Sequence, residues 1–449
     1  MAIFFFFILI ATLLLVNTHV HDFVSKFAMY FYILYFLGSL LISSFNPNGF
    51  YPVSIFTYVV FLVGSMSFIF GFLSYKIKRK SKYVNIESLS KSVDKVCRNK
   101  ILLLCLIAFV VFCYPYVIKA LALAAVQGGA EMDNKDELIF GGGNLVTIVY
   151  NAGMAVASVV AMVVLAASLI LPNKKEKMIM ILITILLQLF YVALSGGRST
   201  LFSVILSLVF VYICFHANDR KISLSRKQFF SFGVVFVFVF IGMTAISNYR
   251  KSGELNIDQN ERKEAFETMG LTFLNYTVVP LNLLDISFKE NYVEKLNGYR
   301  YGRATFSGVD LLIQMVVKRF GVDYETDFYI VHYLQDNRKL CANNRDYNYA
   351  YSMFFFNYMD FGIFGVILIP FLFGRSFRYV IYRFYINPTF SRMLMVVLFF
   401  KMVFLSHFTS PFIRPWDMFL MIILFVWSGL VKQKLLSQAH KCKKQTVAL

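Results

Sequence analysis

Residues 178–216 read MIMILITILLQLFYVALSGGRSTLFSVILSLVFVYICFH, and this stretch decides the fold. Two apolar runs, Met178–Leu194 and Leu201–His216, flank the short turn Ser195–Thr200. Each run is close to the length that a helix needs to cross the hydrocarbon layer of a bilayer. The two glycines of the turn allow the chain to reverse. The stretch therefore predicts a membrane-spanning helical hairpin with Arg198 at its tip.

The position of the charged Arg198 in this hairpin has to be explained. Charges in or near membrane segments are costly, and they are read first as functional residues. A guanidinium offers five donors in one plane, which suits a phosphate or a carboxylate, and the neighbouring glycines let a ligand come close. The alternative is that Arg198 snorkels to the interface and contacts lipid head groups.

The composition extends the membrane reading to the whole chain. Of 449 residues, 58% are hydrophobic and only 15% are charged, which excludes a soluble enzyme, since such proteins are about 25% charged. Apolar runs long enough to span a bilayer recur along the chain, and a helix satisfies all its own backbone hydrogen bonds in lipid. We therefore expect an all-α polytopic membrane protein. About eleven spans (ten to twelve) are expected, at 2–16, 27–44, 52–75, 101–124, 145–171, 178–195, 200–216, 229–247, 352–373, 393–409 and 416–431.

The basic residues give the orientation of these spans. More than half of the 44 Lys and Arg residues lie in alternate connections, and such connections face the cytoplasm. These connections are 76–100, 172–177, 217–228, 374–392 and the tail that follows the last span. The net charge of +19 is therefore mainly a signal of topology, and no nucleic-acid partner is expected.

The opposite side of the membrane receives one large segment, residues 248–351. Its basic and acidic residues nearly balance and it is rich in tyrosine, so we expect one folded extracytoplasmic loop domain with short helices. The predicted organisation is membrane helices in 1–247, this loop domain, further membrane helices in 352–431, and a basic cytoplasmic tail in 432–449.

Within the loop domain, residues 298–308 read GYRYGRATFSG. Ser307 followed by Asp310 resembles a capping box and predicts a helix from about Gly308 to Phe320. Arg300 and Arg303 would then lie just before a helix N-terminus, where backbone donors and the helix dipole favour an anion. The alternative is that both arginines are solvated loop charges.

Two further residues of interest are expected at the outer ends of spans. Asp360 would lie in the outer half of a span, where a buried carboxylate needs a partner, and an ion pair with an arginine is a better expectation than catalysis. His407 could serve as a general base, although a lone histidine at a helix end more often has a structural hydrogen bond.

Five arginines are expected on this same side, and together they suit a membrane-anchored pyrophosphate that bears sugars. Guanidiniums bind phosphates, and tyrosine rings pack against sugar rings. The sequence shows no cluster of carboxylates on the outer side that would bind Mg²⁺. If the pyrophosphate is a leaving group, arginine would neutralise it without a metal or other cofactor. The six cysteines show no metal-binding spacing. The arginines are Arg198, Arg250, Arg300, Arg303 and Arg414.

Four features together resemble a known family. They are the hairpin with Ser195-Gly196-Gly197-Arg198, the large late loop, its Tyr276…Pro280-Leu281 stretch, and the segment Tyr349…Asp360-Phe361-Gly362…Gly365. In this order and topology the chain, from about 178 to 375, resembles the Wzy-type O-antigen polymerases, which are bacterial oligosaccharide repeat-unit polymerases.

The resemblance implies a GT-C-like glycosyltransferase of the bacterial inner membrane. It would join undecaprenyl-pyrophosphate-linked oligosaccharides at the periplasmic face, in contact with membrane lipid and with a chain-length regulator protein as a candidate partner. Loop arginines matter in this family, and the role is carried to Arg198, Arg250, Arg300 and Arg303, with Arg414 as a further candidate. The family does not identify the base, and the candidates here are Glu267, His332, Asp360 and His407.

Two other functions compete with polymerisation. An O-antigen ligase would be expected to carry a clear catalytic histidine in its large loop, whereas His332 here has apolar neighbours. A polysaccharide flippase or other transporter would be expected to show intramembrane charges and pseudo-repeats. Lys119 and Lys401 are the lysines found within predicted spans, and both can snorkel. These contrasts favour the polymerase.

Overall fold

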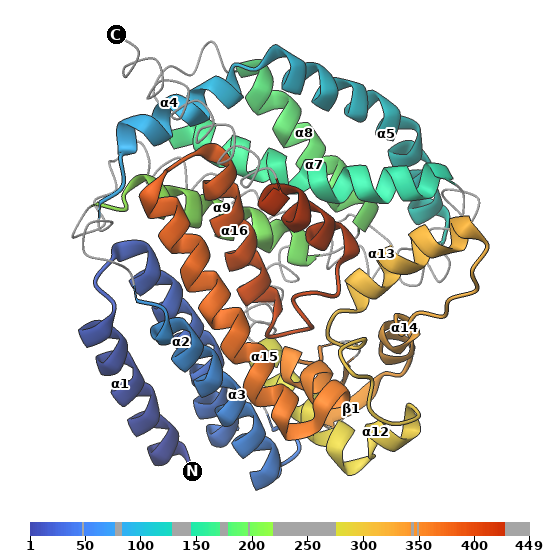
Figure 1. Ribbon diagram of the computed structural model, residues 1–449. Coiled ribbons are helices and arrows are strands. Elements are labelled where there is room, and N and C mark those ends of the chain that lie inside the picture. The colour runs from blue at the N-terminus through green and yellow to red at the C-terminus, as the bar shows by residue number, and fades with distance from the viewer. Residues whose placement is uncertain are drawn as a thin grey trace, which may run out of the picture.

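The computed structural model describes residues 1–46, 49–76, 83–127, 145–170, 178–195, 198–218, 275–342, 345–347 and 350–426, and these residues are mainly helical (Figure 1). Their strands are the short β1 (Lys339–Ala342) and β2 (Arg345–Tyr347), which pair antiparallel. The prediction of a helical membrane protein is confirmed for the described residues.

Five of the described helices are long and apolar enough to cross a membrane. They are α1 (Ala2–His19), α2 (Phe23–Phe45), α3 (Ile55–Ser74), the Lys100–Lys119 part of α5 (Lys100–Gln127) and α15 (Met353–Ile386). Helices also occupy the other expected spans that the structure describes, namely α7 (Leu145–Ile170), α8 (Met178–Ser195), α9 (Arg198–Phe215), α16 (Phe390–Leu405) and Pro415–Val426. The expected span 229–247 lies outside the described residues.

Helices α3 and α15 run side by side in the same direction (Figure 1). Glycines allow this close approach: a Cβ on Gly71 would collide with the carbonyl oxygen of Phe371, and one on Gly374 would collide with that of Phe68. Larger side chains at these positions would force the two backbones apart. This close packing therefore fixes α3 and α15 relative to each other, and the pair positions the loops at its two ends.

The helix α15 is broken near its start, where one continuous span was expected. Phe361 has φ −143° and Gly362 has φ +60°, so the backbone leaves the helical region between Asp360 and Ile363. The positive φ at Gly362 is in the left-handed region that glycine adopts at little cost. The break separates a short outer segment, 353–360, from the long remainder of the helix.

Two buried ion pairs join helices of the bundle. Lys401 Nζ lies 3.0 Å from both carboxylate oxygens of Asp417, and Arg378 Nη1 lies 2.7 Å from Asp22 Oδ2. Lys401, which could have snorkelled, instead donates to a carboxylate on the next helix inside the bundle. A buried charge needs such a partner, since an unpaired one costs several kcal/mol.

The basic connection 76–100 contains a helix that charge counting did not reveal. Helix α4 (Ile86–Cys97) is amphipathic and buries Leu89, Val93 and Cys97 against the bundle. The hydroxyl of Ser92 accepts a hydrogen bond from the backbone N–H of Phe390, at 3.0 Å, where α16 begins. This connection is thus packed against the ends of the spans.

The described part of 248–351 forms a layer at the opposite end of the bundle (Figure 1). Its helices are 275–289, α12 (Tyr292–Lys295), α13 (Ser307–Val317) with a 3₁₀ turn at Lys318–Phe320, and α14 (Tyr329–Asp336). Ser54 caps α3, and the Asp285 carboxylate joins the layer to this helix start by accepting from the Ser54 nitrogen at 2.9 Å and from the Thr57 hydroxyl at 2.8 Å. The layer and the spans share one hydrophobic core.

Candidate functional site

The loop that carries Arg300 and Arg303 is held by the short outer segment of α15. The backbone N–H of Arg300 donates to the carbonyl of Met359 at 3.0 Å. The carboxylate of Asp360 accepts from the backbone N–H groups of Ala304, at 3.0 Å, and Thr305, at 2.7 Å. Because Asp360 is fully buried, these bonds fix the loop on the end of the membrane helix.

Asp360 therefore has backbone partners, and the expected ion pair with an arginine is wrong within the described part of the chain. The break in α15 explains the difference. It ends the first helical segment at Asp360, where the turn containing Tyr301 lies against it: the N–H of Tyr301 donates to the carbonyl of Asp360 at 3.3 Å. The carboxylate itself is bonded to the backbone N–H groups of Ala304 and Thr305, in the place that a guanidinium was expected to take.

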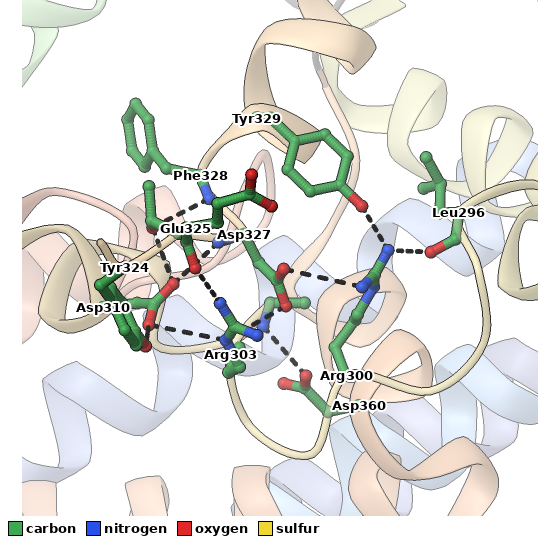
Figure 2. Close-up of polar contacts among 12 residues, drawn as sticks. Leu296, Arg300, Arg303, Asp310, Tyr324, Glu325, Asp327, Phe328, Tyr329 and Asp360 are labelled. Carbon is green, nitrogen blue, oxygen red and sulfur yellow. Dashed lines mark hydrogen bonds and ion pairs between the residues drawn. The ribbon is translucent and has the colours of Figure 1, made fainter. Parts of the chain in front are cut away.

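Arg300 is largely enclosed within the layer. Its Nη1 lies 3.6 Å from Asp327 Oδ1, and its other terminal nitrogen donates to the Leu296 carbonyl and the Tyr329 hydroxyl (Figure 2). The guanidinium also lies 5.6 Å from the centre of the Tyr329 ring. With 14% of its side chain exposed, Arg300 is oriented by contacts on several sides.

Arg303 is held in the same way but keeps an open edge. Its Nε lies between two carboxylates, 3.6 Å from Asp310 Oδ1 and 3.5 Å from Asp327 Oδ2. Its terminal nitrogen donates to the Glu325 carbonyl, and the guanidinium lies 5.5 Å from the centre of the Tyr324 ring. The side chain is 41% exposed, so Arg303 presents an oriented charge to the solvent.

Asp310 orders the segment that surrounds the two guanidiniums. It accepts hydrogen bonds from the Tyr324 hydroxyl, from Thr326 Oγ1 at 2.7 Å and from the backbone N–H of Asp327 at 2.8 Å (Figure 2). A carboxylate with three donors and a nearby guanidinium is satisfied although its residue is 5% exposed. Asp310 thereby fixes Asp327 between the arginines.

The predicted capping box is wrong, although the helix that it indicated is present. Helix α13 begins at Ser307 with Phe306 as its N-cap residue, and no side chain caps it. Asp310 bonds to the 324–327 segment, so it is not available for the reciprocal cap. The helix does end where expected, because Gly321 takes φ +74° after the 3₁₀ turn.

The electrostatics of Asp327 are a balance of opposing effects. Burial raises the pKa of its carboxyl above the ordinary value, and the charge of Asp310 adds to the rise. The guanidiniums of Arg300 and Arg303 act in the other direction without cancelling it. The roles of Asp310 and Asp327 beside the arginines were missed from the sequence, where Asp310 was assigned only to a helix cap and Asp327 was only counted among the acids of the loop. The signal was that two arginines three residues apart in an apolar, tyrosine-rich loop need carboxylate partners.

Arg414 lies in a segment that the structure brings to this loop. The Ser410 hydroxyl donates to the Thr305 carbonyl at 2.6 Å, and the Gly308 N–H donates to the Phe412 carbonyl at 3.1 Å. The connection between the last two described helices thus packs on the start of α13. The candidate arginines 300, 303 and 414 share one end of the bundle.

His407 was expected at the outer surface, but it lies in the protein core. It is fully buried, and its Nε2 is 3.0 Å from the carbonyl oxygen of Thr277. Its ring packs among those of Tyr35, Phe36 and Phe61, with centroids 4.4, 4.9 and 6.0 Å away. These contacts give His407 a structural role that links α16 to helix 275–289.

The remaining candidates lie wholly or partly outside the described residues. Arg250 and Glu267 fall outside them altogether. Arg198 begins α9 and His332 lies on α14, but only their backbones are described. The roles expected for these four residues stay predictions.

Comparison with known protein families gives one match that spans nearly the whole chain. Residues 1–434 match the family described as O-antigen polysaccharide polymerase Wzy, and the chain belongs to this family. The match includes the N-terminal spans, which contributed only hydropathy to the resemblance. No curated protein and no solved structure matches the chain.

Proposed function

We propose that this member of the O-antigen polymerase Wzy family joins undecaprenyl-pyrophosphate-linked oligosaccharide repeat units at the periplasmic face of the bacterial inner membrane. Family membership carries the general activity, which is O-antigen repeat-unit polymerisation. The lipid carrier, the membrane face and the residues below are the finer parts of the proposal.

The direction of helix α15 supports the periplasmic assignment. Helix α15 runs from the arginine loop to the far end of the bundle, where Arg375 and Arg378 contact Ser74 and Asp22 at the ends of neighbouring helices. Basic residues gather on the cytoplasmic side of membrane proteins. The arginine loop at the other end then faces the periplasm. The proposal keeps about eleven spans in a GT-C-like arrangement, with the divisions 1–247, 248–351, 352–431 and 432–449.

The single observation that carries the site is the state of Arg303. Its guanidinium is partly exposed, yet Asp310, Asp327 and the Tyr324 ring already set its orientation. Guanidinium–phosphate contacts are charge-assisted and paired, and donors that need no reorganisation contribute most to catalysis. We assign Arg303, supported by Arg300, to the pyrophosphate of the donor.

The reaction needs one bond made and one broken. A hydroxyl oxygen of the acceptor unit attacks the anomeric carbon of the donor sugar, and the bond from that carbon to the pyrophosphate oxygen breaks. The hydroxyl proton passes to a base, and the lipid pyrophosphate leaves with the electron pair. The arginines stabilise the negative charge that builds on the leaving oxygen.

Arg198 and Arg250 are proposed to complete the phosphate site, and Arg414 to border it. Among the base candidates, the contacts of Asp360 and His407 favour positioning roles. Glu267 and His332 therefore remain the candidates for the proton acceptor.

The test is reconstitution. Purified protein in liposomes is given undecaprenyl-pyrophosphate-linked repeat units from a strain blocked in polymerisation, and products are resolved by length. A ladder of lipid-linked chains supports the proposal. Transfer of a single repeat unit to added lipid A–core, with no lipid-linked product of two or more units, would contradict it in favour of a ligase.

A further inference from the structure

A cavity of about 210 Å³ lies in the outer layer beside the arginine loop. Its walls come from the start of α3, the end of helix 275–289, α12 and the outer segment of α15. Met359 lines it, and the carbonyl of this same residue accepts the backbone N–H of Arg300 at 3.0 Å. The lining residues are Phe56, Ser287, Phe288, Asn291, Tyr292, Val293, Phe355, Tyr358 and Met359.

Aromatic rings form a continuous run along this cavity. Phe288 meets Phe56 edge-on at 5.1 Å between centroids and Tyr358 edge-on at 4.7 Å. Phe56 is 49% exposed, whereas the deeper Tyr292 and Phe355 are almost fully buried. The cavity thus has an open aromatic side and a closed aromatic floor.

Polar groups accompany the rings. Asn291 is exposed in a turn where its φ of +48° places it in the left-handed region, and Tyr358 contributes a phenol. A sugar ring has an apolar face that packs on an aromatic ring and hydroxyls that bond to amides and phenols. A lipid chain has no use for these polar groups. The closed floor also stops an extended chain from continuing into the bundle.

We propose that this cavity is a carbohydrate subsite that takes one sugar ring of the lipid-linked oligosaccharide. The inference rests on the proposed function, which places the sugar-bearing pyrophosphate at Arg300 and Arg303. The volume is below the roughly 300–1,000 Å³ of sites that enclose drug-sized ligands, which suits a single ring. Met359 joins the two sites through the backbone, so the subsite sets where the sugar lies relative to the phosphates.

The test uses variants that change the cavity and leave the arginine network intact. Tyr358→Ala removes one ring of the aromatic run. Asn291→Gly removes the amide and keeps the left-handed backbone, so the turn is preserved. Phe320→Ala is the matched control, because it removes a 79% exposed ring of the same layer outside the cavity. Thermal stability in detergent is measured for all variants.

The probe is the free repeat-unit oligosaccharide, released from its lipid, with binding followed by saturation-transfer NMR. We expect saturable binding to the wild type and to Phe320→Ala. Tyr358→Ala and Asn291→Gly should bind about tenfold more weakly, the effect of losing one good contact of about 1.4 kcal/mol. Equal binding by Tyr358→Ala and Phe320→Ala, or no saturable binding to the wild type, would overturn the subsite.

A second probe separates sugar from lipid and the subsite from the proposed function. Undecaprenyl phosphate, which has no sugar, should bind equally to the wild type and Tyr358→Ala. Weaker binding of this lipid by Tyr358→Ala, with unchanged oligosaccharide binding, would mark the cavity as a lipid-chain groove. Failure of the proposed function is seen separately, as a wild-type protein that binds the oligosaccharide but builds no ladder.

Discussion

The carboxylate of Asp360 lies 2.7 Å from the backbone nitrogen of Thr305, so the end of a membrane helix holds the loop that carries two arginines. The helix breaks directly after this contact, at Phe361 and Gly362. The Asp-Phe-Gly sequence thereby has a physical explanation: the aspartate anchors the loop and the glycine lets the helix turn away beneath it.

Asp360→Asn should slow polymerisation through the position of the loop. Asparagine has one acceptor oxygen for two backbone donors, so one N–H group is left unsatisfied at a cost of about 1–3 kcal/mol. We expect faster amide hydrogen exchange over residues 300–305 and a lower rate of polymerisation. Because Asp360 positions the loop and does not exchange the proton, the shape of the pH–rate profile should stay the same. Loss of one limb of that profile would instead identify Asp360 as the base.

Arg198→Lys should block the formation of long polymer as fully as Arg198→Ala. Lysine keeps the charge but lacks the planar set of donors that binds a phosphate through two contacts. The measurement is polymer length in cells, with protein amount and topology confirmed for each variant. Near-normal polymer with lysine would show that only a positive charge is needed there.

Polymerisation should not require a divalent metal. The proposal neutralises the leaving pyrophosphate with guanidiniums, which remain charged without a metal ion. Ladder formation in the reconstituted system should therefore survive excess EDTA. Activity that EDTA abolishes and Mg²⁺ or Mn²⁺ restores would require a different leaving-group chemistry.

The Lys401–Asp417 pair should behave as a buried structural pair. Replacing Lys401 alone by Met leaves a carboxylate without its partner in a site where Asp417 is 2% exposed, at a cost of about 3–5 kcal/mol. Replacing both residues, with Lys401→Met and Asp417→Leu, should recover most of that loss. Thermal unfolding in detergent measures both. A single variant as stable as the wild type would mean that the buried charge finds another partner.

Features with a local cause could be predicted from the sequence. The apolar runs predicted the described spans, because a bilayer demands long hydrophobic helices whatever their neighbours are. The helix after residue 307 ended where Gly321 allows a left-handed residue. Both follow from residues that lie close together in the chain.

Features that depend on distant partners could not be predicted. Asp360 bonds to Thr305, which is 55 residues away, and hydropathy says nothing of that contact. Asp310 looked like part of a cap, yet the segment around Thr326 competes for it more effectively. Lys401 looked able to snorkel until the next helix supplied Asp417. In each case a buried polar group found its partner through the tertiary fold.

The central claim is that the oriented guanidinium of Arg303 binds the donor pyrophosphate. Its most direct measurement is the single-turnover rate of the reconstituted protein, comparing Arg303→Ala with Arg319→Ala, an exposed arginine of the same layer. We predict that Arg303→Ala is slower by about ten- to a hundredfold, as for one charge-assisted phosphate contact made in the transition state, while Arg319→Ala matches the wild type. Equal rates for the two variants would contradict the account.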